Sequence, residues 1–204
     1  MGKLIIFFVT IYLVFPSSLW AEKVGSYATY KWTSKIEATI DVLNKTVSSD
    51  GKVSYKVTKE SVKPKPIYLT YAILKTTDKD YLVQVVTREA KDKEPLSISQ
   101  IVIDRSTGKG IKAVIRSPKG IPLSFPPGKE LIHVQEKAVK DGKKVNITVE
   151  GGAFSCLQGT FKGQSVCVSD EFPTLGIVKA TLEDGTVELV ESSPTGAKDL
   201  IRKK

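Results

Sequence analysis

The sequence has little of the side-chain chemistry that most enzymes use. Its 204 residues include one histidine, His133, one methionine and two cysteines. A catalytic triad, a cysteine–histidine pair or a zinc site would each depend on this single imidazole. One histidine and two cysteines make a weak set of catalytic or metal-binding side chains. Gly108 and Gly110 lack the spacing and the following helix of a phosphate-binding loop. We therefore predict a protein that is not an enzyme, with no catalytic residues, no metal site and no cofactor.

Long apolar runs are also missing, except for one at the start of the chain. Lys3 precedes a charge-free apolar run from Leu4 to Phe15, and the chain then reaches the small residue Ala21 after a proline. This pattern predicts a signal peptide over residues 1–21, and residues 22–204 as a single β-rich domain in the periplasm or secreted. An uncleaved anchor is the alternative, although the run is shorter than the roughly 20 residues of a membrane span.

Acidic residues are absent from one stretch in the middle of a chain whose formal net charge is +9. This stretch predicts contact with an anionic partner, such as a membrane surface, and the alternative is a solvated face that only aids solubility. We do not expect nucleic-acid binding, because no aromatic residues alternate with the basic ones to stack on bases. The candidate residues are Arg105, Lys109, Lys112, Arg116, Lys119 and Lys129.

Short runs of β-branched and aromatic residues recur along the chain and predict an all-β fold. Asp-Gly pairs at Asp50-Gly51, Asp141-Gly142 and Asp184-Gly185 favour hairpin turns and therefore antiparallel meanders. We expect a strongly curved antiparallel sheet, either a half-barrel or a flattened barrel. The proline-rich segment from Pro118 to Gly128 is expected to form a loop. The predicted strands span residues 24–32, 35–43, 52–58, 67–74, 81–87, 97–103, 111–115, 131–139, 144–149, 154–161, 165–168, 177–182 and 186–190.

Two of these strands are apolar on both faces, namely the strands over residues 67–74 and 81–86. A sheet with one wet face would alternate between apolar and polar residues, so both faces of these strands must be covered. A second sheet, strong curvature or a bound apolar ligand would each provide the cover.

The last third of the chain carries the most distinctive sequence. Glu150-Gly-Gly-Ala-Phe-Ser-Cys156 is followed by Val166-Cys-Val-Ser-Asp-Glu-Phe-Pro173 and by Gly176-Ile-Val-Lys179. This succession resembles an uncharacterised family of exported bacterial β-sheet proteins, with Cys167 in place of an aromatic residue. More loosely, the predicted architecture resembles the periplasmic lipoprotein carriers and the outer-membrane lipoprotein receptors. That resemblance implies an apolar or lipoprotein-like ligand.

Cys156 and Cys167 are predicted to form a disulfide if the chain is exported. A four-residue loop over residues 160–163 would place them directly opposite each other. A two-residue turn at Lys162-Gly163 would instead pair Cys156 with Ser169 and leave the sulfurs diagonal on one face. Two buried thiols, or a redox or metal role, are the alternatives to a disulfide.

These observations lead to the hypothesis of a non-catalytic exported binding or carrier protein for a lipid or lipoprotein-like ligand. The alternative is a structural or interaction module whose core is filled by its own side chains. The sequence gives no indication of the oligomeric state. The candidate ligand-lining residues are Ile67, Leu69, Tyr71, Ile73, Leu82 and Val85.

Overall fold

A computed structural model describes residues 24–107, 110–116, 123–125, 139–161, 163–169 and 176–201. These residues form thirteen strands and no helix, so none of the described segments is a helix that could cross a membrane. The predicted signal peptide lies outside the described residues, as does most of the predicted strand over residues 131–139.

The strands are short and rich in β-branched residues, in agreement with the all-β prediction. They are β1 (Tyr27–Ser34), β2 (Ala38–Val47), β3 (Val53–Val62), β4 (Ile67–Thr76), β5 (Asp80–Arg88), β6 (Ser97–Asp104), β7 (Gly110–Arg116), β8 (Leu123–Phe125), β9 (Lys140–Val149), β10 (Gly152–Phe161), β11 (Gln164–Val168), β12 (Ile177–Thr181) and β13 (Gly185–Ser193).

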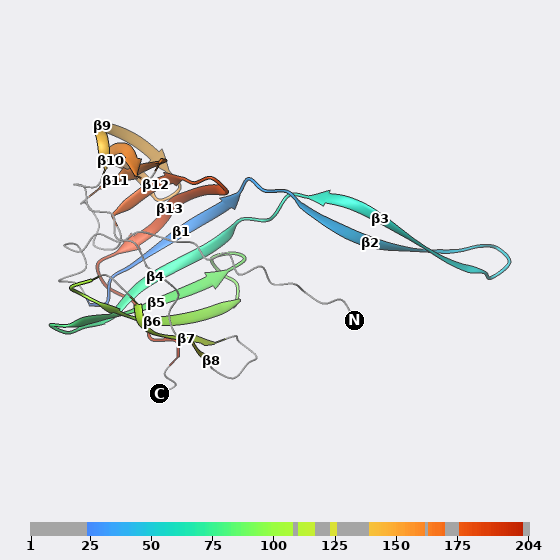
Figure 1. Ribbon diagram of the computed structural model, residues 1–204, viewed down its shortest axis with the longest axis horizontal. Coiled ribbons are helices and arrows are strands. Elements are labelled where there is room, and N and C mark those ends of the chain that lie inside the picture. The colour runs from blue at the N-terminus through green and yellow to red at the C-terminus, as the bar shows by residue number, and fades with distance from the viewer. Residues whose placement is uncertain are drawn as a thin grey trace.

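Eleven of the strands form one antiparallel sheet, in the order β8-β7-β6-β5-β4-β1-β13-β12-β11-β10-β9 (Figure 1). Strands β4 to β8 make one meander and β9 to β13 make another, which confirms that prediction. Strand β1 joins the two meanders, because it pairs with β4 on one side and with β13 on the other. The described strands do not close into a barrel, so the predicted half-barrel or flattened barrel is not confirmed. The remaining two strands, β2 and β3, pair only with each other.

One end of the sheet bends back on itself. The amide of Gly151, in the β9–β10 turn, donates a hydrogen bond of 3.1 Å to the carbonyl of Leu189 in β13. Strands β11 and β12 separate β10 from β13, so a flat sheet would hold them about 14 Å apart. A side chain at Gly151 would meet the β13 backbone, at 3.1 Å from the Leu189 carbonyl oxygen. A larger residue at this position would therefore press on the β13 backbone, which a glycine avoids.

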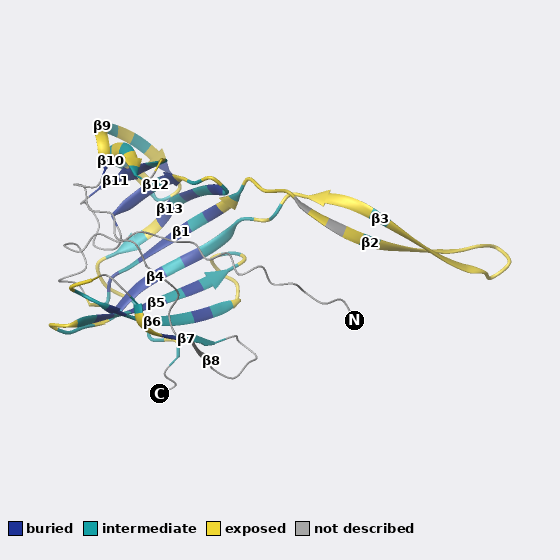
Figure 2. Cartoon of the chain, viewed as in Figure 1, coloured by how far each residue is buried: buried dark blue, intermediate teal, exposed yellow. Residues whose placement is uncertain are grey.

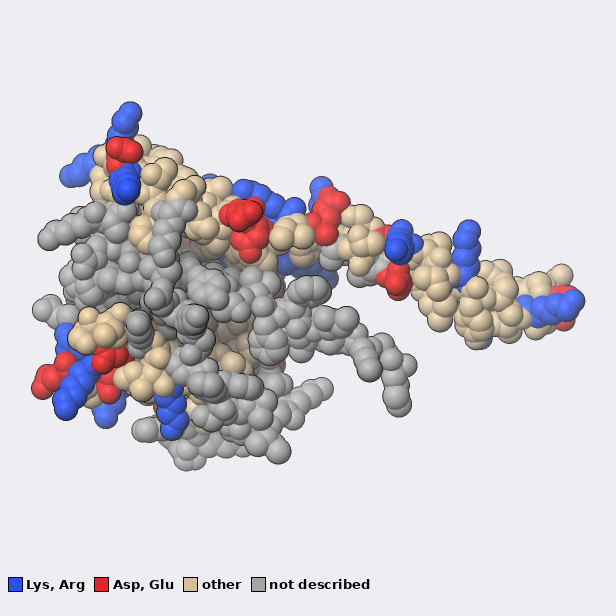
Figure 3. All heavy atoms as spheres, viewed as in Figure 1, with Lys and Arg blue, Asp and Glu red and all other residues tan. Residues whose placement is uncertain are grey.

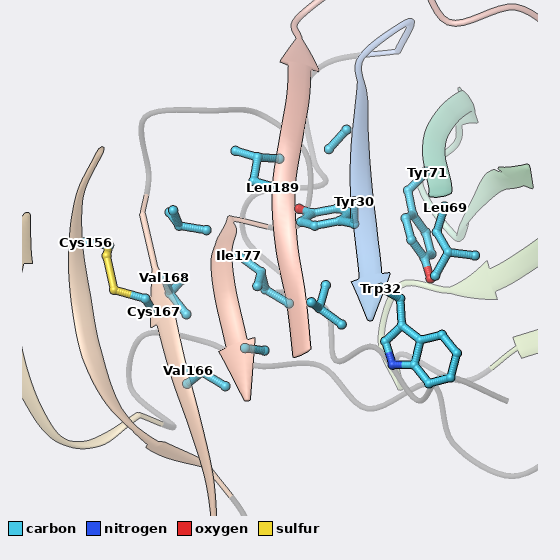
Figure 4. Close-up of a cluster of buried hydrophobic side chains, with 14 of the residues drawn as sticks. Tyr30, Trp32, Leu69, Tyr71, Cys156, Val166, Cys167, Val168, Ile177 and Leu189 are labelled. Carbon is cyan, nitrogen blue, oxygen red and sulfur yellow. A yellow bond between two sulfur atoms is a disulfide. The ribbon is translucent and has the colours of Figure 1, made fainter. Parts of the chain in front are cut away.

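In β1 and the first meander the hydrophobic core lies on one face of the sheet, and it continues into the second meander (Figure 4). From β1, Tyr30 is fully buried and Trp32 is 6% exposed. The register places Tyr30 opposite Leu69, and strand alternation puts the other core side chains of β4 on the same face. From the second meander, Val168 and Leu189 are also buried in this cluster. We call this surface the core face and the other surface the outer face.

The outer face of the first meander is crossed by the C-terminal segment 194–201, which we call the strap. The side chain of Gln84, only 2% exposed, donates to the carbonyl of Lys198 at 2.8 Å and accepts from the amide of Leu200 at 2.9 Å. Gln100 donates to the Asp199 carboxylate at 2.8 Å. The strap, held by the side chains of Gln84 and Gln100, therefore covers part of the outer face of the strands that are apolar on both faces. None of the three predicted kinds of cover was a segment of this type.

Two local predictions about turns and loops were wrong. Asp141 and Gly142 lie inside β9 rather than in a turn, and Asp141 has a φ of 55° where the β9–β10 register shifts. The Asp-Gly pair thus forms an irregularity within a strand. Such an irregularity, like a hairpin turn, needs residues that tolerate a positive φ. The segment predicted as a loop contains β8, a three-residue strand at the sheet edge. An edge strand has only one partner, so flanking prolines are tolerated there.

Candidate functional site: a projecting hairpin

The predicted ligand-lining residues fall on both faces of the sheet. Leu69, Tyr71 and Ile73 are at most 5% exposed and form part of the core cluster (Figure 4). Ile67 and Val85 are partly buried against that cluster.

Leu82 lies on the outer face instead. In β5 it alternates with Val83 and Val85, so it shares its face with the buried side chain of Gln84. Leu82 therefore cannot line the same surface as the other five residues.

Two of the predicted basic residues, Arg105 and Arg116, make hydrogen bonds within the described part of the chain. Arg105 lies over the Tyr81 ring, 5.0 Å from its centroid, and donates to the Thr77 carbonyl at 2.9 Å. Arg116 donates to the carbonyl of Ile201 in the strap at 3.3 Å. Lys112 lies on β7, and the remaining three, Lys109, Lys119 and Lys129, lie outside the described residues.

The predicted disulfide joins Cys156 in β10 to Cys167 in β11, with their Cα atoms 5.6 Å apart. Phe161 pairs with Gln164, so the turn has two residues, and Gly163 has a φ of 79°. Cys167 pairs with Gln158, which places Cys156 two residues further along the same face. The structure thus selects the diagonal arrangement from the two alternatives.

The most exposed feature is the β2–β3 hairpin, which projects from the sheet (Figures 1 and 2). Ten residue pairs join its strands, from Ala38 opposite Val62 to Val47 opposite Val53. Ser48 accepts from the amide of Gly51, whose φ of 78° allows the tight turn. Nine of the ten residues of β3 are exposed. The side chains of β3 are therefore largely exposed rather than packed in the core.

The outer half of this hairpin is apolar on one face. Directly opposite residues share a face, so the pairs Leu43–Val57, Lys45–Tyr55 and Val47–Val53 lie together. The five apolar members are each between 47% and 63% exposed. We call this surface the apolar arm face, and it consists of Leu43, Val47, Val53, Tyr55 and Val57.

The opposite face of the same half is polar. It carries the pairs Asn44–Lys56 and Thr46–Ser54, and the Asn44 amide donates to Thr58 Oγ1 at 2.8 Å. Lys52 at the turn pairs with Asp50 at 3.1 Å, whereas Lys45 and Lys56 take part in no ion pair among the described residues. Figure 3 shows these charged groups scattered along the hairpin. The outer half is therefore amphipathic, with lysines beside an apolar surface.

A second site lies on the outer face of the sheet, between the two meanders. It is a polar pocket of about 190 Å³ lined by Tyr27, Thr29, Tyr68, Thr70, Arg88 and Lys91, with Glu191 at one side. The Tyr27 hydroxyl donates to Glu191 at 2.5 Å. This hydrogen bond is the first cause of the raised pKa of Tyr27.

Comparisons with known proteins give no relative for this chain. No family model, curated protein or solved structure matches it.

Sequence reasoning predicted the two strands of the hairpin but not its functional surface. The signal was present, since Leu43, Val47, Val53, Tyr55 and Val57 occupy alternate positions on both sides of the Asp50-Gly51 turn. Such alternation normally marks a face that packs on a core. Only the structure shows that this face is left exposed.

Proposed function

We propose that this protein is a non-catalytic, exported binding protein that attaches to an anionic lipid membrane surface through the apolar arm face. The observation that carries the proposal is the group of five apolar side chains, each about half exposed, on one face of a projecting hairpin. Contiguous exposed apolar surface on a soluble protein typically marks a contact with a partner or a membrane. A disulfide is compatible with export to an oxidising compartment.

The energies involved favour a membrane contact. Complete burial of a valine or leucine side chain is worth about 1.5–3 kcal/mol, so five half-exposed side chains could contribute on the order of 5 kcal/mol. Lysines near an anionic bilayer add about 1 kcal/mol each. Lys45 and Lys56 are free of carboxylate partners among the described ion pairs, so they can meet lipid phosphates.

A second copy of the chain fits this face less well. Five residues of a strand extend about 17 Å, and two strands span about 10 Å. Two arm faces pressed together would then bury on the order of 350 Å², whereas a specific interface buries more than about 1,000 Å². A bilayer needs no complementary partner surface, so the small area is no obstacle to that contact.

An interior ligand, the other form of the carrier hypothesis, is less well supported. Leu69, Tyr71 and Ile73 are at most 5% exposed, so a ligand at these residues would have to displace packed core side chains. The arm face requires no such rearrangement.

The test is sedimentation of the expected mature chain, residues 22–204, with two kinds of vesicle. One contains phosphatidylethanolamine and phosphatidylglycerol, and the other contains phosphatidylcholine alone. We expect binding to the anionic vesicles that weakens as salt is added. The double variant Leu43→Thr, Val57→Thr, which changes one cross-strand pair to a residue type that favours strands, should bind about tenfold more weakly.

Val42→Thr is the matched control, because Val42 lies on the same strand but on the opposite face. It should bind as the unaltered chain does. Equal binding of the double variant, or no binding of the unaltered chain to anionic vesicles, would overturn the proposal. A dimer that the double variant disrupts would assign the face to a second copy instead.

A further inference from the structure

The polar pocket on the outer face contains none of the residues of the apolar arm face. Its volume of about 190 Å³ is close to the volume that roughly six water molecules occupy in liquid water. It therefore suits a small polar group rather than an acyl chain.

The strand register brings the pocket residues together. Glu191, Thr29 and Thr70 stand directly opposite one another on β13, β1 and β4, so they form a row across one face. In the next row, Arg88 at the end of β5 stands opposite Tyr68. The pocket thus has a carboxylate at one side, a guanidinium at the other and hydroxyl groups between them.

Arg88 is the lining cation with the fewest partners in the part of the chain that the structure describes. There its guanidinium makes one hydrogen bond, a long one of 3.4 Å to Thr70 Oγ1. Among the described residues it belongs to no ion pair. A guanidinium presents five donors in a planar fork that matches carboxylate and phosphate oxygens. Most of these donors are therefore available to a ligand.

The neighbouring charges have partners already. Glu150 forms ion pairs with Lys91 at 3.1 Å and with Lys31 at 3.5 Å. The hydrogen bond from Lys91 is the largest cause of the lowered pKa of the Glu150 carboxyl group, and Lys31 adds to it. Glu191 accepts the Tyr27 hydroxyl and can accept further hydrogen bonds from hydroxyl groups. The arrangement favours one anionic group beside Arg88 and neutral hydroxyl donors beside Glu191.

We propose that this pocket binds a small ligand that carries one oxyanion, a carboxylate or a phosphate, together with hydroxyl groups. Arg88 holds the oxyanion through paired hydrogen bonds, the Thr70 hydroxyl donates to it, and Glu191 accepts from a ligand hydroxyl. An acidic monosaccharide or a phosphorylated glycerol headgroup has this chemistry.

The test measures binding of galacturonate and glycerol phosphate to the chain of residues 22–204 by titration followed with NMR. We expect saturable binding of at least one probe. Arg88→Gln should weaken it at least tenfold, and Arg88→Lys, which keeps the charge but loses the fork, should weaken it to an intermediate degree. Lys93→Gln, a neighbouring exposed lysine outside the pocket lining, should leave it unchanged.

Absence of saturable binding with both probes, or equal binding by Arg88→Gln, would overturn the proposal. Preference for glycerol phosphate, with competition by phosphatidylglycerol vesicles, would identify a lipid headgroup as the source, and preference for galacturonate would identify an acidic sugar. The hairpin variant Leu43→Thr, Val57→Thr should retain binding of the small probes, which separates this pocket from the membrane contact.

Discussion

At the scale of single residues, Tyr30 and Tyr71 are the most informative ionisable groups in the core. Their rings meet edge to face, with centroids 5.9 Å apart. Burial raises the pKa of both phenols above the ordinary value of 10.0, and for Tyr30 the neighbouring Tyr71 adds to the increase. Both hydroxyls are therefore held protonated in the folded protein beyond the pH at which they would ionise in the unfolded chain.

This burial predicts alkaline unfolding. Above pH 10 the folded state binds more protons than the unfolded state, so the free energy of unfolding falls as pH rises. The expected slope is up to about 1.4 kcal/mol per pH unit for each tyrosine. Ultraviolet absorbance of tyrosinate, recorded with circular dichroism, should show that these two groups ionise only as the sheet is lost. Their reversible ionisation near pH 10 in a folded chain would contradict the assignment.

At the scale of elements, the Cys156–Cys167 disulfide fastens β10 to β11 in the bent end of the sheet. The two cysteines are eleven residues apart, so closing this loop contributes about 3 kcal/mol on the chain-entropy model. Urea unfolding of the same chain with and without reductant should show this difference. Equal urea midpoints with and without reductant would mean that the hydrogen bonds and packing of the β10–β11 hairpin stabilise the bent end of the sheet without help from the disulfide.

Sequence reasoning predicted elements well where alternation and turn chemistry agreed. For β4 to β7 and for β10 to β13, the predicted strands differ from the observed ones by a few residues at their ends. It failed at Asp141-Gly142, because a residue pair suited to a turn is equally suited to an irregular strand. The strap was not predicted either, because the partners of Gln84 and Gln100, the Lys198 carbonyl and the Asp199 carboxylate, lie in a distant segment of the chain.

The two candidate sites were less predictable than the strands. The pocket draws on β1, β4, β5 and β13, so its residues become neighbours only through the sheet order. The predicted strand over residues 81–87 ends before Arg88, so nothing in the sequence indicates that Arg88 stands opposite Tyr68.

At the scale of the whole molecule, β1 makes the two meanders into one cooperative sheet. Replacing Tyr30 by alanine should lower the free energy of unfolding by about 3–5 kcal/mol, because a fully buried aromatic ring is lost from this seam. Hydrogen exchange should then quicken in both meanders together. Tyr55→Ala is the matched control, since the same residue type is 62% exposed there and should cost about 0.5 kcal/mol or less. Faster exchange in only one meander would show that the two unfold independently.

The path of the chain gives the projecting arm a further meaning. Trp32 in β1 stands directly opposite Ile67 in β4, so the chain leaves the sheet and returns to the neighbouring strand. Residues 35–66 are thus an insert at a point where a short connection would suffice, and the order of the other eleven strands does not depend on them. Because residues 35–66 add no strand to the eleven-stranded sheet, we expect that a shorter connection between β1 and β4 would leave the order of that sheet unchanged.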